Sequence, residues 1–465
     1  METQDTKKIK ATGFDIDDFD MEHLTQLLKD RHLHEARELL SECNEVDLAE
    51  ILSELDDEEL PIAFRILPKE LAADAFSYLE PETQETLIHA FSDKELNFIV
   101  ANLFLDDTVD MIEEMPANVV KRILMNTDPV TRREINELLK YPEDSAGSIM
   151  TTEYVRLQEE MTVQEAFDRI RKVGVDKETI YTCYVTNAKR ELLGVVTIKD
   201  LLLSAYETEI RDIMETNVIY VNTMEDQEKV AHDFDRYNFL SIPVVDKEHR
   251  LVGIITFDDV IDVLQEENTE DIERMAAIIP TDKPYMKTSA FETFKKRIPW
   301  LLLLMISATF TGAIIAHYEE ALGAYVVLTA YIPMLMDTGG NAGSQASVSI
   351  IRGLSLEEIE FSDIFRIQGK EFLVSLLCGA TLAVANFIKL VCFDGVTVTI
   401  ALVVCLTLIC TVIVAKFVGC SLPILAKKVG FDPAVMASPF ITTIVDALSL
   451  LIYFQFASHI LHLQA

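Results

Sequence analysis

The chain has 465 residues, enough for several domains, and its 77 Asp and Glu against 40 Lys and Arg give a formal net charge of −37. This acidity argues against a nucleic-acid partner, which requires clustered Lys and Arg, and favours cations. Residues 1–300 hold 66 Asp and Glu against 33 Lys and Arg, whereas residues 301–465 hold 11 against 7. A soluble acidic part therefore precedes an apolar part.

The first 140 residues carry a helical repeat. Residues 1–20 are polar and acidic, lack the apolar core of a secretory signal, and are predicted to be disordered. Helix-starting residues such as Pro81 and the capping pair Ser92 and Glu95 recur in the segments that follow. Similar segments begin every 12 residues, at Leu55, Leu67, Leu79, Phe91, Leu103 and Met115. Units this short must stack to bury a core, so an all-α solenoid is predicted over 21–140.

A second repeat, of about 60 residues, occupies residues 141–266, with copies at about 148–206 and 212–266. In each copy an amphipathic segment precedes a β-branched strand, a turn, a second strand and a helix. Residues 193–200 and 252–259 are the most alike. This pattern predicts an α/β tandem.

A connecting helix is predicted over residues 267–297, acidic at its start and basic at its end. Residues 298–465 then hold five runs that reach the roughly 20 apolar residues that a membrane span requires. These runs are approximately Pro299–Ala316, Ala321–Ile350, Phe372–Cys392, Val396–Leu425 and Ala434–Leu461. The predicted fold class is a multidomain membrane protein with a solenoid, an α/β tandem and a transmembrane domain of five helices.

Basic residues near the span ends predict the orientation, because such residues are retained in the cytosol. They are Lys295, Lys296, Arg297, Arg352, Arg366, Lys370, Lys427 and Lys428. This distribution places the N-terminal 300 residues in the cytosol and the C-terminus outside, with the spans in the lipid bilayer of the plasma membrane. The seven cysteines show neither a CxxC pair nor zinc spacing, which suits a reducing compartment.

The second span carries a polar stripe, which is costly in lipid and normally faces a partner helix or a water-filled path. Asp337, Asn341 and Gln345 recur every four residues and so share one helical face. Pro333 is expected to leave one carbonyl oxygen free, because proline lacks an N–H. Nearby glycines would let another backbone approach: Gly339, Gly340 and Gly343.

The fifth span repeats this arrangement, with Ser438, Thr442, Asp446 and Ser449 on one face. An Asp at the centre of a span costs about 2.5–3.5 kcal/mol, which calls for a compensating cation, proton or partner. Asp446 is therefore the leading candidate for an ion site. The alternative is that Asp446 hydrogen-bonds to Asn341 or Thr442 and serves helix packing.

The candidate ligands in the spans offer only oxygen atoms, and this limits which ions they would bind. Carboxylates, amides and hydroxyls suit Mg²⁺, Ca²⁺ and Mn²⁺, whereas Zn²⁺ or Cu⁺ sites would use His or Cys. Mg²⁺ keeps most of its water and is held by one or two carboxylates, so a sparse site fits it best. Two chains could bring two copies of Asp446 together at a two-fold axis.

The α/β halves resemble a CBS-domain pair, and with residues 333–345 and 442–446 the whole chain resembles the MgtE magnesium channel family. The resemblance implies a homodimer with the pore between subunits and the selectivity carboxylate at Asp446. It also implies that cytosolic Mg²⁺ binds acidic residues of the N-domain, CBS pair and connecting helix and favours the closed state. The implied ligands are Asp74, Asp106, Asp110, Asp226, Glu228, Asp259, Glu267, Glu270 and Asp271.

Two departures from the family pattern stand out. Asn238 occupies a position where the family often has an Asp ligand, so that site is expected to be weaker or to use Asp235. Ser449 replaces a glycine usual three residues after the pore aspartate, which bears on helix packing. The pattern Gly194, Thr197, Asp200 and its copy Gly253, Thr256, Asp259 could also hold ATP.

Alternatives to the channel remain open. A secondary transporter of divalent cations coupled to Na⁺ or H⁺ would normally show an internal repeat in its spans or a proton relay. An enzyme is not expected, because the chain has no P-loop, zinc signature, nucleophile elbow or HExxH. Selectivity among Mg²⁺, Co²⁺ and Mn²⁺ stays open at this point.

Overall fold

The computed structural model describes residues 19–281, 285–286, 288–319, 323, 325–436 and 438–462. The predicted disordered segment 1–20 lies almost wholly outside the described residues. The chain forms two compact units, the first ending at Val263 and the second beginning at Leu264.

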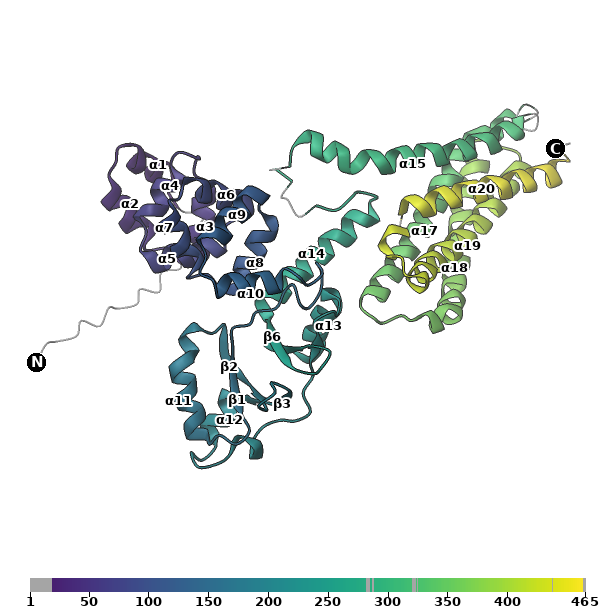
Figure 1. The fold of residues 1–465 in the computed structure, drawn as a ribbon. Helices are drawn as coiled ribbons and strands as arrows, with labels where there is room; N and C mark the ends of the chain where they lie inside the picture. Colours follow the sequence, from purple (N-terminus) through teal and green to yellow (C-terminus); the bar gives the residue numbers. More distant parts are fainter. Residues whose placement is uncertain are drawn as a thin grey trace, which may run out of the picture. The chain divides into compact units, whose positions relative to one another are not determined.

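The first unit begins with short helices, one for each 12-residue repeat from residue 55 onward (Figure 1). Leu67, Leu79, Phe91 and Met115 each precede a helix closely and are buried, so this part of the prediction is confirmed. The superhelical stacking stays a prediction. The helices are α1 (Met21–Lys29), α2 (Leu33–Leu40), α3 (Glu45–Ser53), α4 (Leu60–Ile66), α5 (Lys69–Ser77), α6 (Pro81–Ala90), α7 (Asp93–Val100), α8 (Leu105–Glu114), α9 (Ala117–Asn126) and α10 (Thr131–Leu138).

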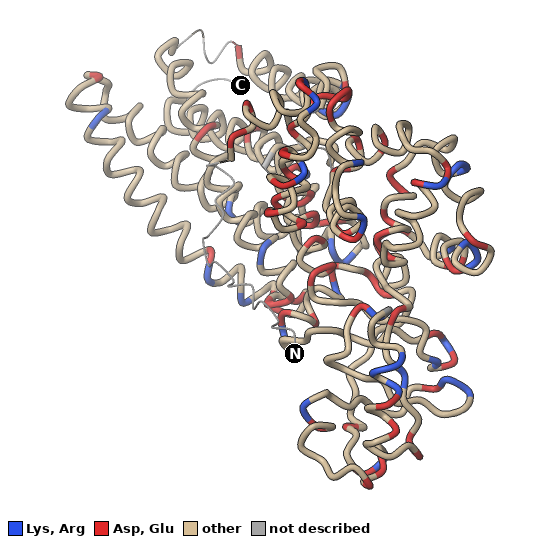
Figure 2. Tube along the Cα trace, turned by 90° about the vertical axis from the view of Figure 1, so that its left-hand side faces the viewer, with Lys and Arg blue, Asp and Glu red and all other residues tan. Residues whose placement is uncertain are grey.

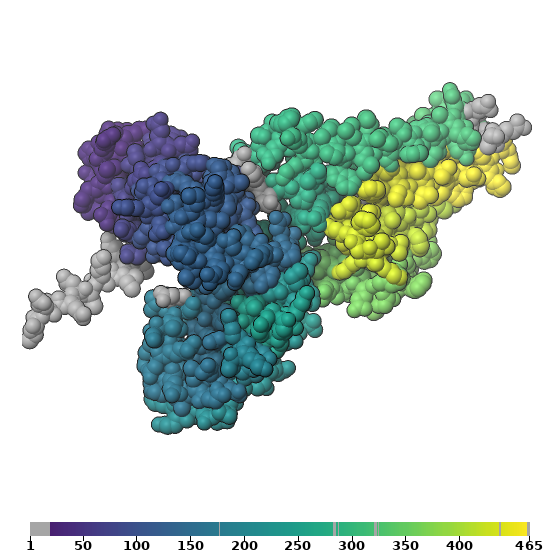
Figure 3. Space-filling model, viewed as in Figure 1, coloured from purple at the N-terminus to yellow at the C-terminus, as the bar shows by residue number. Residues whose placement is uncertain are grey.

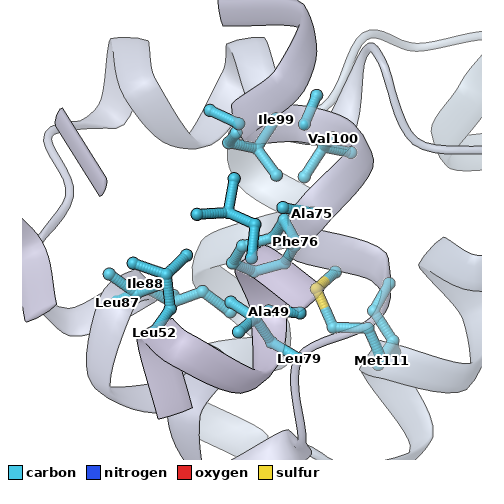
Figure 4. Close-up of a cluster of buried hydrophobic side chains, with 14 of the residues drawn as sticks. Ala49, Leu52, Ala75, Phe76, Leu79, Leu87, Ile88, Ile99, Val100 and Met111 are labelled. Atoms are coloured by element: carbon cyan, nitrogen blue, oxygen red, sulfur yellow. The ribbon is translucent and has the colours of Figure 1, made fainter. Parts of the chain in front are cut away.

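Local sequence starts these helices, and packing between them makes them stable. Pro81 lies in the first turn of α6, and Ser92 and Glu95 form the predicted capping box at the start of α7. Isolated helices of this length are marginal in water, so their stability comes from shared burial. Phe76, Leu87 and Ile88 are fully buried where neighbouring helices meet (Figure 4). Burying each such side chain contributes about 1.5–3 kcal/mol.

Two α/β halves follow, each with a three-stranded sheet whose first pair is parallel and second pair antiparallel. The predicted order of amphipathic helix, strand, turn, strand and helix is confirmed in both. The first half comprises β1 (Tyr154–Gln158), α11 (Val163–Val173), η2 (Gly174–Asp176), β2 (Thr179–Thr186), β3 (Leu192–Thr197), α12 (Ile198–Leu203) and η3 (Ile210–Asp212). The second comprises β4 (Val221–Asn222), α13 (Gln227–Tyr237), β5 (Ser241–Val245), β6 (Leu251–Thr256) and α14 (Phe257–Met275).

The same register recurs in both sheets, with Gly194 opposite Val185 and Gly253 opposite Val244. A Cβ at Gly194 would lie 2.8 Å from the carbonyl oxygen of Glu215, so the glycine admits a crossing backbone. Figure 3 shows the short helices, in purple and blue, packed directly against the teal strand-containing part of this unit.

The predicted connecting helix 267–297 is wrong. Helix α14 begins in the second α/β half at Phe257 and ends at Met275, and a separate helix begins only at Ala290. Ala277 takes a left-handed backbone (φ 55°) and Pro280 follows it, so the helix cannot continue. Ser289 then caps the next helix by accepting from the Glu292 N–H.

The second unit is built of long helices, which are almost entirely tan in Figure 2 because charged residues are rare there. Within the described residues, four segments are long and apolar enough to cross a membrane: Ala290–His317, Phe361–Cys392, Val398–Val429 and Ala434–Leu461. The predicted second span is the less apolar helix α17, so the count of five spans stays a prediction. The elements are α15 (Ala290–His317), η4 (Val326–Tyr331), α17 (Ile332–Ser355), η5 (Phe361–Asp363), α18 (Ile364–Cys392), α19 (Val398–Val429), η6 (Ala434–Met436) and α20 (Ser438–Leu461).

Helix α19 is the central helix of this unit and packs against α17, α18 and α20, whereas α15 packs against α20. The glycines of α17 allow the close approach that the sequence predicts. A Cβ at Gly339 would lie 2.8 Å from Val445 Cγ1, and one at Gly343 would lie 2.7 Å from Ile441 Cγ2. One face of α17 is thus fixed against α20.

Candidate functional site

An acidic cavity of about 330 Å³ lies in the first unit, where the short helices meet the start of α14. The described residues that line it include no Lys, Arg or His. Its acidic lining residues are Glu45, Asp74, Asp106, Asp107, Glu178, Asp258, Asp259 and Asp262. The predicted ligands Asp74, Asp106 and Asp259 are therefore brought together from segments far apart in the sequence.

The carboxylates of this cavity are held in an environment that disfavours their charges. Burial raises the pKa of Asp106 from 3.8 to about 7, and repulsion from Asp107 adds to this effect. Burial also raises the pKa of Asp259 to about 7, with Asp106 as the next cause. Asp110, one turn after Asp106 on α8, is exposed, yet the surrounding protein and Asp106 still raise its pKa. A cation between these groups would relieve the repulsion.

Local structure fixes the direction of Asp259. The hydroxyl of Thr256 donates to Asp259 Oδ2 at 2.5 Å, and the backbone N–H of Thr256 donates to the same atom at 3.3 Å. Thr197 and Asp200 form the equivalent capping box in the first half. The Thr and Asp of the repeat thus have a structural role at the start of a helix, whether or not a nucleotide binds.

The sequence prediction missed five of the acidic residues that line the cavity: Glu45, Asp107, Glu178, Asp258 and Asp262. Asp107 was overlooked although it directly follows Asp106. Glu178 comes from the loop before β2, where nothing in the sequence marks it. Its Oε2 atom is buried without a hydrogen-bond partner among the described residues, and burial and Asp106 raise its pKa to about 8.

Two further predicted ligands, Asp226 and Glu228, do not line the cavity. Both side chains are exposed, and Asp226 Oδ1 accepts from the Glu228 N–H at 2.9 Å to cap α13. At the other end of α13, Asn238 is the C-cap residue with a left-handed backbone (φ 54°), a conformation that Asn tolerates well. The choice of Asn at this position therefore has a structural reason.

The carboxylates of the second unit near residue 270 have a cationic partner. Arg274 forms ion pairs with Glu270, one turn earlier on α14, and with Asp432, just before η6. Glu267 adds to the negative field around Arg274. The predicted ligand Asp271 lies on the same helix. Across the described residues, no three Asp, Glu, His or Cys side chains are placed to hold one metal ion directly.

The polar stripe of α17 is exposed on the surface of the second unit. Asp337, Asn341 and Gln345 are all exposed, whereas Gly339 and Gly343, on the other side of the helix, are buried. The helix therefore presents carboxylate and amide oxygens on a face that no described part of this unit covers.

Asp446 lies beside this stripe. Its half-buried carboxylate is close enough to Asp337 for the two charges to repel. Thr442, one turn earlier, faces Gly340, and its hydroxyl donates to the Pro439 carbonyl at 3.0 Å, not to Asp446. The side chain of Ser438, also predicted to line the path, lies outside the described residues.

The expectation for Pro333 is wrong. Pro333 lies in the first turn of α17, where backbone N–H groups have no intrahelical partner in any case. The carbonyl four residues earlier, that of Thr329, accepts from the Ile332 N–H and so is not left free.

Ser449 packs against α17, as the departure from the family pattern suggests. It is 1% exposed, and its Oγ would lie 3.1 Å from a Cβ placed on Gly339. Gly339 thus makes room for the side chain that α20 carries at this position.

Comparison with known protein families gives consistent matches along most of the chain. Residues 332–456 match the model of a divalent cation transporter family, MgtE; residues 43–144 match the MgtE intracellular N domain; and residues 146–207 and 210–266 match CBS domains.

Relatives match nearly end to end. The magnesium transporter MgtE of Thermus thermophilus is 37% identical over 93% of this chain and 97% of its own length. The magnesium transporter MgtE of Bacillus subtilis is 34% identical over 94% and 96%. The crystal structure of the cytosolic domain of the Mg²⁺ channel MgtE in complex with ATP is 39% identical, with a TM-score of 0.50 over 52% of this chain and 100% of that chain.

Proposed function

Because the chain belongs to the MgtE family of divalent cation transporters, we propose that it is a gated Mg²⁺ channel for magnesium uptake, with Asp446 at its ion site. The observation that carries this proposal is the exposed stripe of Asp337, Asn341 and Gln345 beside Asp446, within an otherwise apolar unit. Polar groups on a membrane-spanning surface are costly unless they face water or another protein surface.

The exposed stripe also supports a homodimer. A second copy facing α17 would enclose a path lined by oxygen atoms and bring two Asp446 carboxylates to one ion. Mg²⁺ suits such a path, because it is held by few carboxylates and retains several waters. Thr442 and Ser438 would add hydroxyl oxygens on the same helix.

We propose that the acidic cavity senses cytosolic Mg²⁺. In the absence of the ion, Asp106, Asp107 and Asp259 repel one another and favour separation of α8 from α14. Bound Mg²⁺, linked to the carboxylates partly through its water ligands, removes this repulsion and favours the closed arrangement. A ligand that binds one state more tightly shifts the population toward that state.

The orientation and the nucleotide are further parts of the proposal. The N-terminal 300 residues face the cytosol and the C-terminus faces outside the plasma membrane, which labelling of a cysteine added after Ala465 in intact cells would test. ATP binding to the CBS pair would be measured by calorimetry on the full-length protein, with inorganic phosphate as the control ligand.

The ion site is tested by Asp446→Ala in a strain that lacks magnesium uptake. We expect this variant to reach the membrane and to fail to restore growth at low Mg²⁺, because the ion loses its charged ligand. Asp394→Asn, which alters an acidic residue outside the apolar spans, should restore growth. Normal growth with Asp446→Ala would refute the assignment.

A coupled transporter is distinguished from a channel by flux into reconstituted vesicles. A channel passes Mg²⁺ down its own gradient after ionophores have collapsed the Na⁺ and H⁺ gradients. Loss of flux under these conditions would replace the channel with a coupled carrier. Parallel assays with Co²⁺ and Mn²⁺ would measure selectivity.

A further inference from the structure

A largely buried ion pair joins two of the apolar helices, α18 and α19. Lys416 of α19 and Glu371 of α18 place Nζ and Oε2 3.1 Å apart, and their side chains are only 9% and 18% exposed. Lys416 lies well inside α19, and Glu371 lies about two turns after the start of α18, directly before the apolar run that begins at Phe372; both helices are long and apolar enough to span a membrane. Each charge alone would be poorly accommodated there, so each depends on the other.

A second polar contact lies one turn away. Gln368, three residues before Glu371 on α18, donates through Nε2 to Ser421 Oγ at 2.7 Å and to the Phe417 carbonyl at 3.2 Å. Apolar side chains can slide past one another at little cost, whereas two directional contacts one turn apart allow only one register between the helices. The pair and the hydrogen bonds therefore fix α19 relative to α18.

Gly419, one turn after Lys416 on α19, meets the helix that carries the stripe. A Cβ on Gly419 would lie 2.3 Å from the Gly343 carbonyl oxygen, and a Cβ on Gly343 would lie 3.1 Å from the Ala415 carbonyl oxygen. Gly343 lies between Asn341 and Gln345 in α17. A shift of α19 is thus transmitted directly to the polar stripe, because backbone meets backbone with no flexible side chain between them.

We propose that Lys416, Glu371 and Gln368 form a clasp near the first turns of α18 that positions α19, and through it the ion-lining face of α17. Lys416 and Glu371 are positioning residues that do not contact the ion. The proposal rests on the proposed function, in that the stripe of α17 is taken to line the ion path.

The test uses the full-length protein reconstituted in vesicles, with Mg²⁺ and Co²⁺ flux measured per folded protein. The variants are Lys416→Met, Glu371→Gln, the double variant Lys416→Met/Glu371→Gln, and the conservative Lys416→Arg. Thermal unfolding in detergent is measured in parallel, so that a loss of folded protein is separated from a change in the path. Asp446→Ala is assayed alongside them.

We expect each single variant to lose at least tenfold in Mg²⁺ flux per folded protein and to change the ratio of Mg²⁺ to Co²⁺ flux. The double variant, which removes both charges, should recover to within about threefold of wild type, and Lys416→Arg should keep the wild-type ratio. Wild-type flux and ion ratio in both single variants would overturn the clasp. A double variant no better than the worse single variant would also overturn it.

The two proposals fail in different ways. If Asp446→Ala abolishes flux while both single variants behave as wild type, the clasp is refuted and the ion site stands. If the single variants change flux as expected while Asp446→Ala does not, the ion site is refuted and the clasp stands without its link to Asp446.

Discussion

Asp106→Asn should stabilise the metal-free form of the acidic cavity. Asp106 is 6% exposed, and burial followed by repulsion from Asp107 raises its pKa from 3.8 to about 7. Each pKa unit corresponds to about 1.4 kcal/mol, so a shift of about three units disfavours the ionised side chain by about 4 kcal/mol. Asparagine keeps the shape of the side chain and removes the charge.

The sign of the pH dependence follows from the raised pKa. A carboxyl group whose pKa is higher in the folded state contributes stability at low pH, and this contribution disappears as the pH rises through about 7. Metal-free wild-type protein should therefore lose stability at the cavity progressively between about pH 4, near the ordinary pKa of the group, and about pH 7, and Asp106→Asn should lose much less. The difference between the two proteins is greatest at pH 8.

Hydrogen exchange of the α8 amides in full-length protein, at pH 8 with EDTA, measures this difference. We expect Asp106→Asn to raise the free energy of opening of α8 by about 2–4 kcal/mol, the lower value applying if neighbouring carboxylates rearrange. Asp168→Asn is the matched control, because Asp168 is exposed and contacts only surface groups, Arg171 through an ion pair and Gln164 through a hydrogen bond. Unchanged or weaker protection in Asp106→Asn would refute the reasoning, as would wild-type protein that gains no protection from Mg²⁺.

The remaining predictions concern backbone contact and the connecting region. Gly419→Ala should destabilise the second unit by about 1–3 kcal/mol and reduce Mg²⁺ flux, because the new methyl group meets the Gly343 carbonyl oxygen. Gly369→Ala is the control, because open space surrounds Gly369, and this variant should unfold at the wild-type temperature or above. Equal melting temperatures for the two variants would contradict this account. Joint neutralisation of Glu267, Glu270 and Asp271 should reduce the protection from protease that millimolar Mg²⁺ gives to the cytosolic residues, because these carboxylates would no longer attract the cation, although Arg274 already balances the charge of Glu270. Undiminished protection would place the sensor elsewhere, and Glu159→Gln/Glu160→Gln is the control.

Local signals predicted much of the fold. Proline or capping residues mark the start of most of the short helices, with α2 and α8 as exceptions. The matching glycines of β3 and β6 reveal the internal repeat of the α/β halves. The prediction of one connecting helix failed because the backbone leaves the helical conformation at Ala277 and Pro280 follows, so α14 ends there. The pattern of charged residues continues past this point and gave no sign of the end of the helix. The first strand of each half, β1 or β4, was not predicted, and β4 has only two residues, too few to show a pattern.

The cavity and the clasp show what a linear sequence cannot predict without a family resemblance. Asp106 and Asp259 meet only because the short helices pack against the second α/β half, and Glu178 joins them from a loop. Lys416 and Glu371 could have been noticed as charges in apolar runs. Their pairing, however, depends on which faces of α18 and α19 meet, and similar apolar side chains surround both helices.

Carboxylates that have a basic side chain as a partner can be distinguished from carboxylates that are candidate ion ligands. Glu371 has Lys416, Glu270 and Asp432 have Arg274, and Asp394 has Lys389, so in each case the protein itself supplies the compensating charge. The described lining of the acidic cavity contains no basic side chain, and Asp446 has a second carboxylate, Asp337, as its charged neighbour. In the cavity and at Asp446, the repulsion between neighbouring carboxylates costs free energy unless a proton neutralises one of them or a cation binds between them. At low pH a proton is enough to relieve the repulsion in the cavity, because the pKa of Asp106 is raised to about 7. At higher pH the repulsion persists until a divalent cation binds, so the cavity should respond to Mg²⁺ most strongly above neutral pH.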